Sequence, residues 1–110
     1  MSASPEFIDY VKDLFKPLGN LTEGKFFGGF AFKSGNKQFA MIMGNTLYFC
    51  VNDNTRPQYE KLEMTPFSYS TKKGIVNVKK YYSAPEELFE DNEALIEWAN
   101  TAIDSAYSYK

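Results

Sequence analysis

KFFGGFAFKSGNKQFAMIMGNTLYFCV, residues 25–51, is the stretch that decides the fold. It consists of short runs rich in Phe, Ile, Met and Tyr, and these runs are interrupted by Ser34-Gly35-Asn36 and by Gly44-Asn45. Apolar runs of this length between Gly/Asn turns are typical of β-strands joined by tight hairpins. The stretch therefore predicts a three-stranded antiparallel meander.

The two turns fix the register of this meander to different degrees. Gly44-Asn45 suits a two-residue type II′ turn, which needs a positive φ at its first position. That turn predicts three cross-strand pairs: Ile42 with Leu47, Met41 with Tyr48, and Phe39 with Cys50. The first loop is either Gly35-Asn36 or Ser34-Gly35-Asn36, and a shift by one residue would move Phe30 and Phe32 to the other face of the sheet.

Both faces of the predicted sheet carry large apolar side chains. Ile42, Leu47, Phe49 and Val51 fall on one face. Phe39, Met41, Met43 and Tyr48 fall on the opposite face. Since a single layer of helices covers only one face, the second set is a candidate interaction surface, and a homodimer is one way to cover it.

The rest of the chain predicts helices and a second hairpin. Ser4-Pro5 opens an amphipathic helix that reaches about Lys16 and ends at Pro17 and Gly19. A short helix follows Asp53, Asn54 or Thr55 and reaches about Leu62, and strands 67–70 and 75–78 flank Thr71-Lys72-Lys73-Gly74. Ser83-Ala84-Pro85-Glu86 suggests a capping box before a brief helix, and a last helix starts at Asp91 or Asn92. The fold class is thus α+β, with two layers, a mostly antiparallel five-stranded sheet and helices on one face, in the order α-β-β-β-α-β-β-α-α.

Length and composition indicate one soluble domain spanning 1–110. The chain has 110 residues, 44% hydrophobic and 17% aromatic, which suits a single core. No apolar run is long enough for a membrane span, and the single cysteine, Cys50, suits a reducing compartment. We therefore expect a cytoplasmic protein without a membrane partner.

No catalytic or metal-binding motif is recognisable. The chain has no histidine, so the usual general base and the commonest metal ligand are both missing. Cys50 stands in an apolar strand without a histidine to generate a thiolate, and we interpret it as structural. We expect a protein that is not an enzyme and has no cofactor or metal.

Charge is divided unevenly near the C-terminus. Residues 66–82 contain Lys72, Lys73, Lys79 and Lys80 with interleaved tyrosines and no acid, which makes them the best candidates for nucleic-acid contacts. Residues 83–106 contain seven acids and no base, which suggests metal ligands, a docking face or, in preference to both, a solvated helix surface. The net charge of −2 disfavours direct nucleic-acid binding, and strand-edge protection explains the lysines equally well.

Phe26-Phe27-Gly28-Gly29 is the most distinctive short segment. It lacks the Lys-Ser/Thr pair of a phosphate loop and the third glycine of a dinucleotide fingerprint, and a strand follows it rather than a helix. Paired glycines at the start of a strand mark a bulge or a close approach of another group. We interpret Phe27, Gly28 and Gly29 as structural or interaction residues.

Together these segments resemble the TfoX N-terminal domain family over nearly the whole chain. The matching pieces, in order, are Glu6-Phe7, Pro17-Leu18-Gly19, Phe27-Gly28-Gly29, Phe39-Ala40, Leu47–Asp53, Pro66–Tyr69, Tyr81–Glu86 and Leu95–Ala99. The family's typical Arg-x-Met-Phe-Gly-Gly is altered here, because Phe26 replaces the methionine and Gly24 stands at the basic position.

The resemblance implies an α+β fold and a non-enzymatic regulatory or protein-interaction role. In competence regulators of this family, the domain is joined to a second one associated with control of transcription. The alternatives are direct nucleic-acid binding through the lysine-rich hairpin 66–82, or binding of a small ligand, which would need a deep pocket with convergent polar groups.

Overall fold

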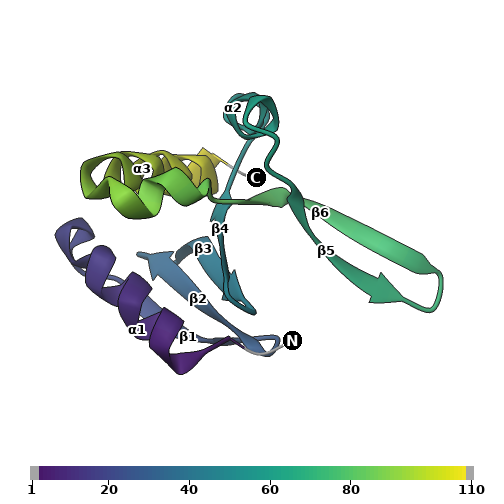
Figure 1. The fold of residues 1–110 in the computed structure, drawn as a ribbon, viewed down its shortest axis with the longest axis horizontal. Coiled ribbons are helices and arrows are strands. Elements are labelled where there is room, and N and C mark those ends of the chain that lie inside the picture. Colours follow the sequence, from purple (N-terminus) through teal and green to yellow (C-terminus); the bar gives the residue numbers. More distant parts are fainter. Residues whose placement is uncertain (1–2, 109–110) are drawn as a thin grey trace.

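A computed structural model describes residues 3–108, so residues 1–2 and 109–110 of the expected domain lie outside the described part (Figure 1). Helix α1 (Pro5–Leu14) and the 3₁₀ turn η1 (Lys16–Leu18) precede four strands: β1 (Thr22–Phe26), β2 (Gly29–Ser34), β3 (Lys37–Met43) and β4 (Thr46–Cys50). Helix α2 (Arg56–Lys61), strands β5 (Pro66–Thr71) and β6 (Gly74–Ser83), the 3₁₀ turn η2 (Glu86–Glu90) and helix α3 (Asn92–Ser108) complete the chain. The predicted α+β class is confirmed.

The strands form one antiparallel sheet in the order β1-β2-β3-β4-β6-β5. This sheet has six strands, so the predicted number of five is wrong. The additional strand is β1, and the meander therefore has four strands instead of three. Its first four residues, Thr22-Glu23-Gly24-Lys25, are polar or glycine and exposed, because β1 lies at the sheet edge.

The predicted register of the β3–β4 hairpin is confirmed. Met43 pairs with Thr46, Ile42 with Leu47 and Met41 with Tyr48. Gly44 has φ 62°, the positive value that the predicted turn needs. The paired residues end at Ala40–Phe49, one step before the expected Phe39–Cys50 pair.

A bulge moves Phe39 away from the face on which it was predicted. Ser34 pairs with Lys37, so the first loop is Gly35-Asn36, but the register shifts between Phe32 and Lys33. An extra residue in one strand changes which side the following side chains face. The Phe39 ring consequently packs 5.8 Å from the ring of Phe15, at the end of α1.

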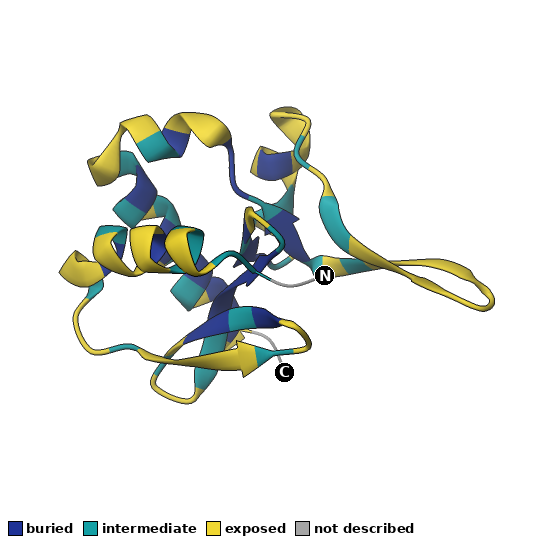
Figure 2. Ribbon diagram, turned by 60° about the horizontal axis from the view of Figure 1, so that its bottom comes forward, coloured by how far each residue is buried: buried dark blue, intermediate teal, exposed yellow. Residues whose placement is uncertain are grey.

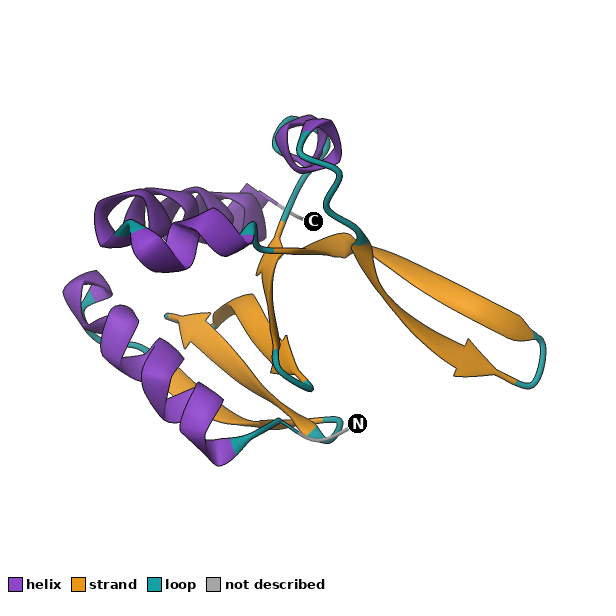
Figure 3. Cartoon of the chain, viewed as in Figure 1, coloured by secondary structure: helices purple, strands orange, loops and turns teal. Residues whose placement is uncertain are grey.

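Aromatic contacts place the three helices on one face of the sheet. Phe49 and Tyr82 are direct cross-strand partners and so share a face. The Phe49 ring lies 6.2 Å from Phe15, next to α1. On the same face, Tyr82 contacts Tyr59 of α2, and Tyr59 contacts Trp98 of α3. In Figure 3, α1 and α3 accordingly lie on the side away from the β5–β6 hairpin.

The candidate surface of Phe39, Met41, Met43 and Tyr48 is not an exposed patch. Phe39 is fully buried, and Met41 and Met43 are 2% and 6% exposed. Only Tyr48 is partly exposed. The expectation of an open apolar sheet face is therefore wrong for three of its four residues.

The starts of α1 and α3 agree with the sequence, whereas the start of η2 differs. Ser4 caps α1 as predicted, because its hydroxyl accepts a hydrogen bond from the Phe7 amide. The predicted capping box at Ser83–Glu86 is wrong, since η2 starts after Pro85 without a side-chain cap. Among residues 3–108, no helix is long and apolar enough to cross a membrane.

Candidate functional site

The β5–β6 hairpin, Pro66–Ser83, projects from the body of the molecule, and we call it the arm (Figure 1). Its turn is Lys72-Lys73, between the paired Thr71 and Gly74. The Thr71 hydroxyl stabilises this turn by donating to the Gly74 carbonyl at 2.9 Å and accepting from the Lys73 amide at 3.2 Å. The predicted second hairpin is confirmed, but its projection into solvent was not predicted.

The base of the arm is fixed to the body, whereas its outer half is free. The Arg56 side chain donates to the Lys79 carbonyl at 3.1 Å and forms an ion pair with Asp53 at 2.7 Å. The Tyr82 hydroxyl, at the base, donates to the Glu60 carboxylate at 3.1 Å. Residues 68–77 are all exposed, as the yellow outer half of the hairpin in Figure 2 shows.

One face of the arm carries an apolar stripe, Phe67, Tyr69, Val76 and Val78, formed by two cross-strand pairs. The stripe continues into the body, because the Phe67 ring lies 5.4 Å from the ring of Tyr48. Tyr69 is 49% exposed, and Ile75 on the other face is 72% exposed. Two-stranded hairpins are marginally stable in water, and the exposed apolar groups of this arm make it a candidate interaction surface.

The four candidate lysines all lie on the arm. Lys72 and Lys73 form its tip, and Lys79 is exposed near its base. Lys80 is half-buried, with its ammonium 6.0 Å from the centre of the Tyr81 ring. No acidic residue occurs between Met64 and Pro85, so the arm carries only positive charge.

A groove of about 760 Å³ lies beside the base of the arm. Its apolar lining comes from Phe7, Leu47, Met64, Ala84 and Phe89, and its charged lining from Glu86, Glu87 and Glu90. No lysine or arginine lines it among the described residues. The sequence showed the acidic stretch but not the groove, because α1, β4 and η2 meet only in the folded chain.

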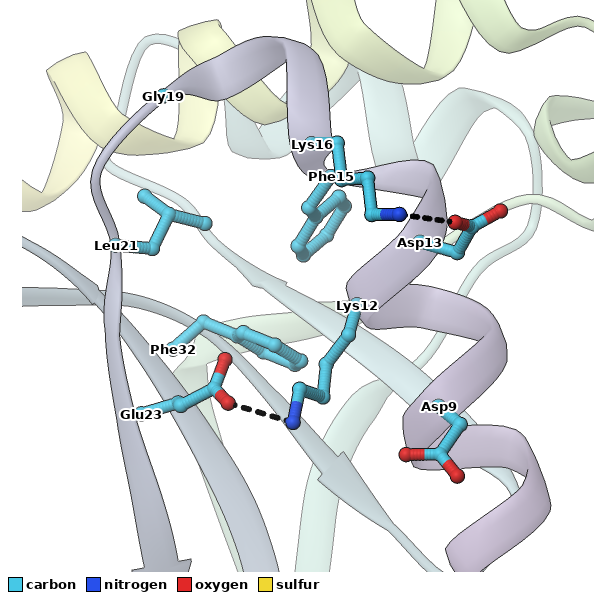
Figure 4. Close-up of a pocket in the computed structure, with 9 residues that line it drawn as sticks. All are labelled: Asp9, Lys12, Asp13, Phe15, Lys16, Gly19, Leu21, Glu23 and Phe32. Atoms are coloured by element: carbon cyan, nitrogen blue, oxygen red, sulfur yellow. Dashed lines mark ion pairs between the residues drawn. The ribbon is translucent and has the colours of Figure 1, made fainter.

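The depression between α1 and β1 is smaller, and four of its five charged side chains form ion pairs (Figure 4). It encloses about 360 Å³ over Phe15 and Phe32. Lys12 contacts Glu23 at 2.8 Å and Lys16 contacts Asp13 at 3.0 Å. The hydrogen bond and the negative charge of Glu23 raise the pKa of Lys12. The Lys12–Glu23 pair joins α1 to the sheet edge, whereas the Lys16–Asp13 pair is local to the end of α1.

The Phe27-Gly28 pair forms the turn between β1 and β2. Phe26 pairs with Gly29, and both turn residues have positive φ, 47° and 83°. This is the geometry of a type I′ hairpin turn, which favours Asn-Gly. Phe27 is thus an aromatic residue in a left-handed conformation, and it is 86% exposed.

Replacing Phe27 with asparagine is expected to stabilise the protein by about 0.5–1 kcal/mol, because asparagine tolerates the left-handed region. Urea unfolding of the variant measures the change. Phe27→Ala is the matched control, since it removes the same ring and its contact with Phe26 without this conformational advantage. Equal stability of the two variants would contradict the prediction.

Cys50 is buried, and its burial disfavours the thiolate form that a nucleophile needs. It is 1% exposed, opposite Tyr81 in the sheet. Burial raises the pKa of its thiol from 9.0 to about 11. Among the described residues, no group of three His, Cys, Asp or Glu is placed to hold a metal ion.

Alkaline pH is expected to weaken the fold through Cys50. The folded-state pKa is raised to about 11, so the contribution is complete below about pH 9 and is lost as pH rises through 11. At about 1.4 kcal/mol per pKa unit, the rise from 9.0 to about 11 corresponds to a loss of about 3 kcal/mol. Urea unfolding from about pH 8 to about pH 11 should show a steeper decline for the wild type than for Cys50→Ala. Parallel declines would refute this role.

Comparison with known proteins agrees with the resemblance. The model of the TfoX N-terminal domain family matches residues 13–106. This range includes the β1–β2 turn, the arm and most of α3. No curated protein sequence matches the chain. The family match covers nearly all of the sequence, and the chain therefore belongs to the TfoX N-terminal domain family.

Proposed function

We propose that this chain is a non-catalytic regulatory domain that acts in the cytoplasm by binding a protein partner through the arm. The observation that carries the proposal is the projection of the arm with its exposed apolar side chains, above all Tyr69 and Ile75. A domain that needs only its own core for stability gains nothing from apolar groups held in water. Membership of a family named for a competence regulator supports a regulatory role.

The test compares two double variants of the full chain. Tyr69→Ser with Ile75→Ser removes exposed apolar groups from the arm, and Phe27→Asn with Leu62→Ser removes them elsewhere. In affinity capture from the native host, we expect proteins bound by the wild type to be lost with the arm variant and kept with the control. Partners that bind all three equally would overturn the proposal.

Direct nucleic-acid binding is the second candidate, favoured by the exposed tip lysines Lys72 and Lys73 on an arm without acids. Lysines that neutralise phosphates make affinity fall steeply with salt. Duplex and single-stranded DNA probes at low salt should then bind the wild type and not the Lys72→Ala, Lys73→Ala, Lys79→Ala, Lys80→Ala variant. Absence of binding to either probe would remove this candidate.

A further inference from the structure

We propose that the partner of the arm is a second copy of this chain, whose groove beside Glu86 and Glu87 receives the lysine tip. This inference rests on the proposed function of the arm and names its partner. Both halves of the contact lie on the same molecule, at opposite ends of the arm: the tip at Lys72-Lys73, and the groove at its base, lined by Met64 and Ser83.

Charge is complementary between tip and groove. The tip carries Lys72 and Lys73, and the nearest acids along the chain are Glu63 and Glu86. The groove is lined by Glu86, Glu87 and Glu90 and, among the described residues, by no base. Opposite potentials on two surfaces steer their association. They also disfavour arrangements in which two like-charged surfaces face each other.

Apolar chemistry is complementary as well. Ile75 follows the tip and is 72% exposed, whereas Phe7, Leu47 and Phe89 line the groove with apolar surface. Burying such a side chain in an apolar groove favours association. The tip and the groove therefore match in both charge and hydrophobicity.

The tip of the arm cannot enter the groove of its own chain, because it points away from the body (Figure 1). Two arms laid antiparallel about a two-fold axis place each tip at the base of the other. This is a closed, isologous arrangement in which every contact is made twice. β5 is also the edge strand of the sheet, so no other strand of the chain separates the two arms.

An interface made of two arms is small, and we expect dissociation in the micromolar range. Sedimentation of the full chain from about 1 to about 200 µM should show a monomer–dimer equilibrium. Lys72→Glu with Lys73→Glu should weaken the dimer at least about tenfold, because like charges then face each other. Lys25→Glu with Lys33→Glu makes the same change of net charge at exposed positions outside the arm and should leave the equilibrium unchanged.

A charge exchange makes the test specific for the groove. Glu86→Lys with Glu87→Lys should also be monomeric, since a basic tip would meet a basic groove. Mixed with the Lys72→Glu, Lys73→Glu variant, it should form a heterodimer, because both tips then meet grooves of opposite charge. Failure of this mixture to associate, with both variants folded by circular dichroism, would overturn the proposal.

The outcome separates this inference from the proposed function. A monomer at all concentrations that still captures proteins through its arm would overturn the second copy as partner and leave the arm as a docking element. A monomer that binds the DNA probes would assign the lysines to nucleic acid instead. A monomer that does neither would overturn both proposals.

Discussion

Replacing Phe15 with alanine is expected to lower the free energy of unfolding by about 3–5 kcal/mol, which is a large part of the stability of a small domain. Phe15 is 1% exposed at the end of α1. Its ring contacts the rings of Phe32, Phe39 and Phe49 at 5.1, 5.8 and 6.2 Å. It thereby joins α1 to three consecutive strands, and its removal leaves a cavity at their centre.

Urea unfolding followed by circular dichroism measures this loss. Tyr10→Ala is the matched control, because Tyr10 is an aromatic residue of the same helix that is 46% exposed. We expect the control to cost about 1 kcal/mol or less, since Tyr10 packs only at the surface, against Phe7 and Phe89. Similar losses for both variants would show that Phe15 is not the central contact of this core.

Interactions between residues that are close in the sequence were sufficient to predict most helices and strands. Gly44-Asn45 fixed the β3–β4 register, because a two-residue turn with positive φ at Gly44 allows only one pairing of its flanks. Ser4-Pro5 located the start of α1. The Ser4 hydroxyl caps the helix, and the fixed φ of Pro5 favours the first helical position, which follows the cap. In these places the determining interaction lies within a few residues along the chain.

Other features depended on contacts that sequence patterns do not contain. β1 has almost no apolar residue, so only its pairing with β2 defines it as a strand. The bulge at Phe32/Lys33 placed Phe39 beside Phe15, and no local turn signal indicates this shift. The burial of Met41 and Met43 likewise follows from tertiary packing, which alternation along one strand does not reveal.

The residues of the candidate site could be predicted from the sequence, but the surface that they form could not. Lys72, Lys73, Lys79 and Lys80 were identified because they cluster in sequence without acids. The projection of the arm was not predicted, because it depends on how much of β6 is covered by β4 and α2. The groove joins Phe7 with Glu86, which are distant in the sequence, so charge patterning showed only its acidic half.

Gly29→Ala is expected to destabilise the protein by about 2–3 kcal/mol, although alanine is usually tolerated in strands. A Cβ at Gly29 would overlap the Ile42 carbonyl oxygen and lie 2.5 Å from the Met43 sulfur. The carbonyl belongs to the strand that pairs with β2 at Phe30–Ile42, so it cannot move without disturbing the sheet.

The matched control for Gly29 is Gly24→Ala on the adjacent strand β1, where a Cβ would meet nothing within 4 Å. That change should be neutral or stabilise by up to about 1 kcal/mol, because alanine restricts the unfolded chain. Thermal and urea unfolding of both variants give the difference directly. A large loss at Gly29 alone would mean that the last glycine of the Phe27-Gly28-Gly29 motif is retained for close packing of β2 on β3. Equal effects at the two glycines would rule out that role. The role of the motif would then lie in its exposed turn at Phe27.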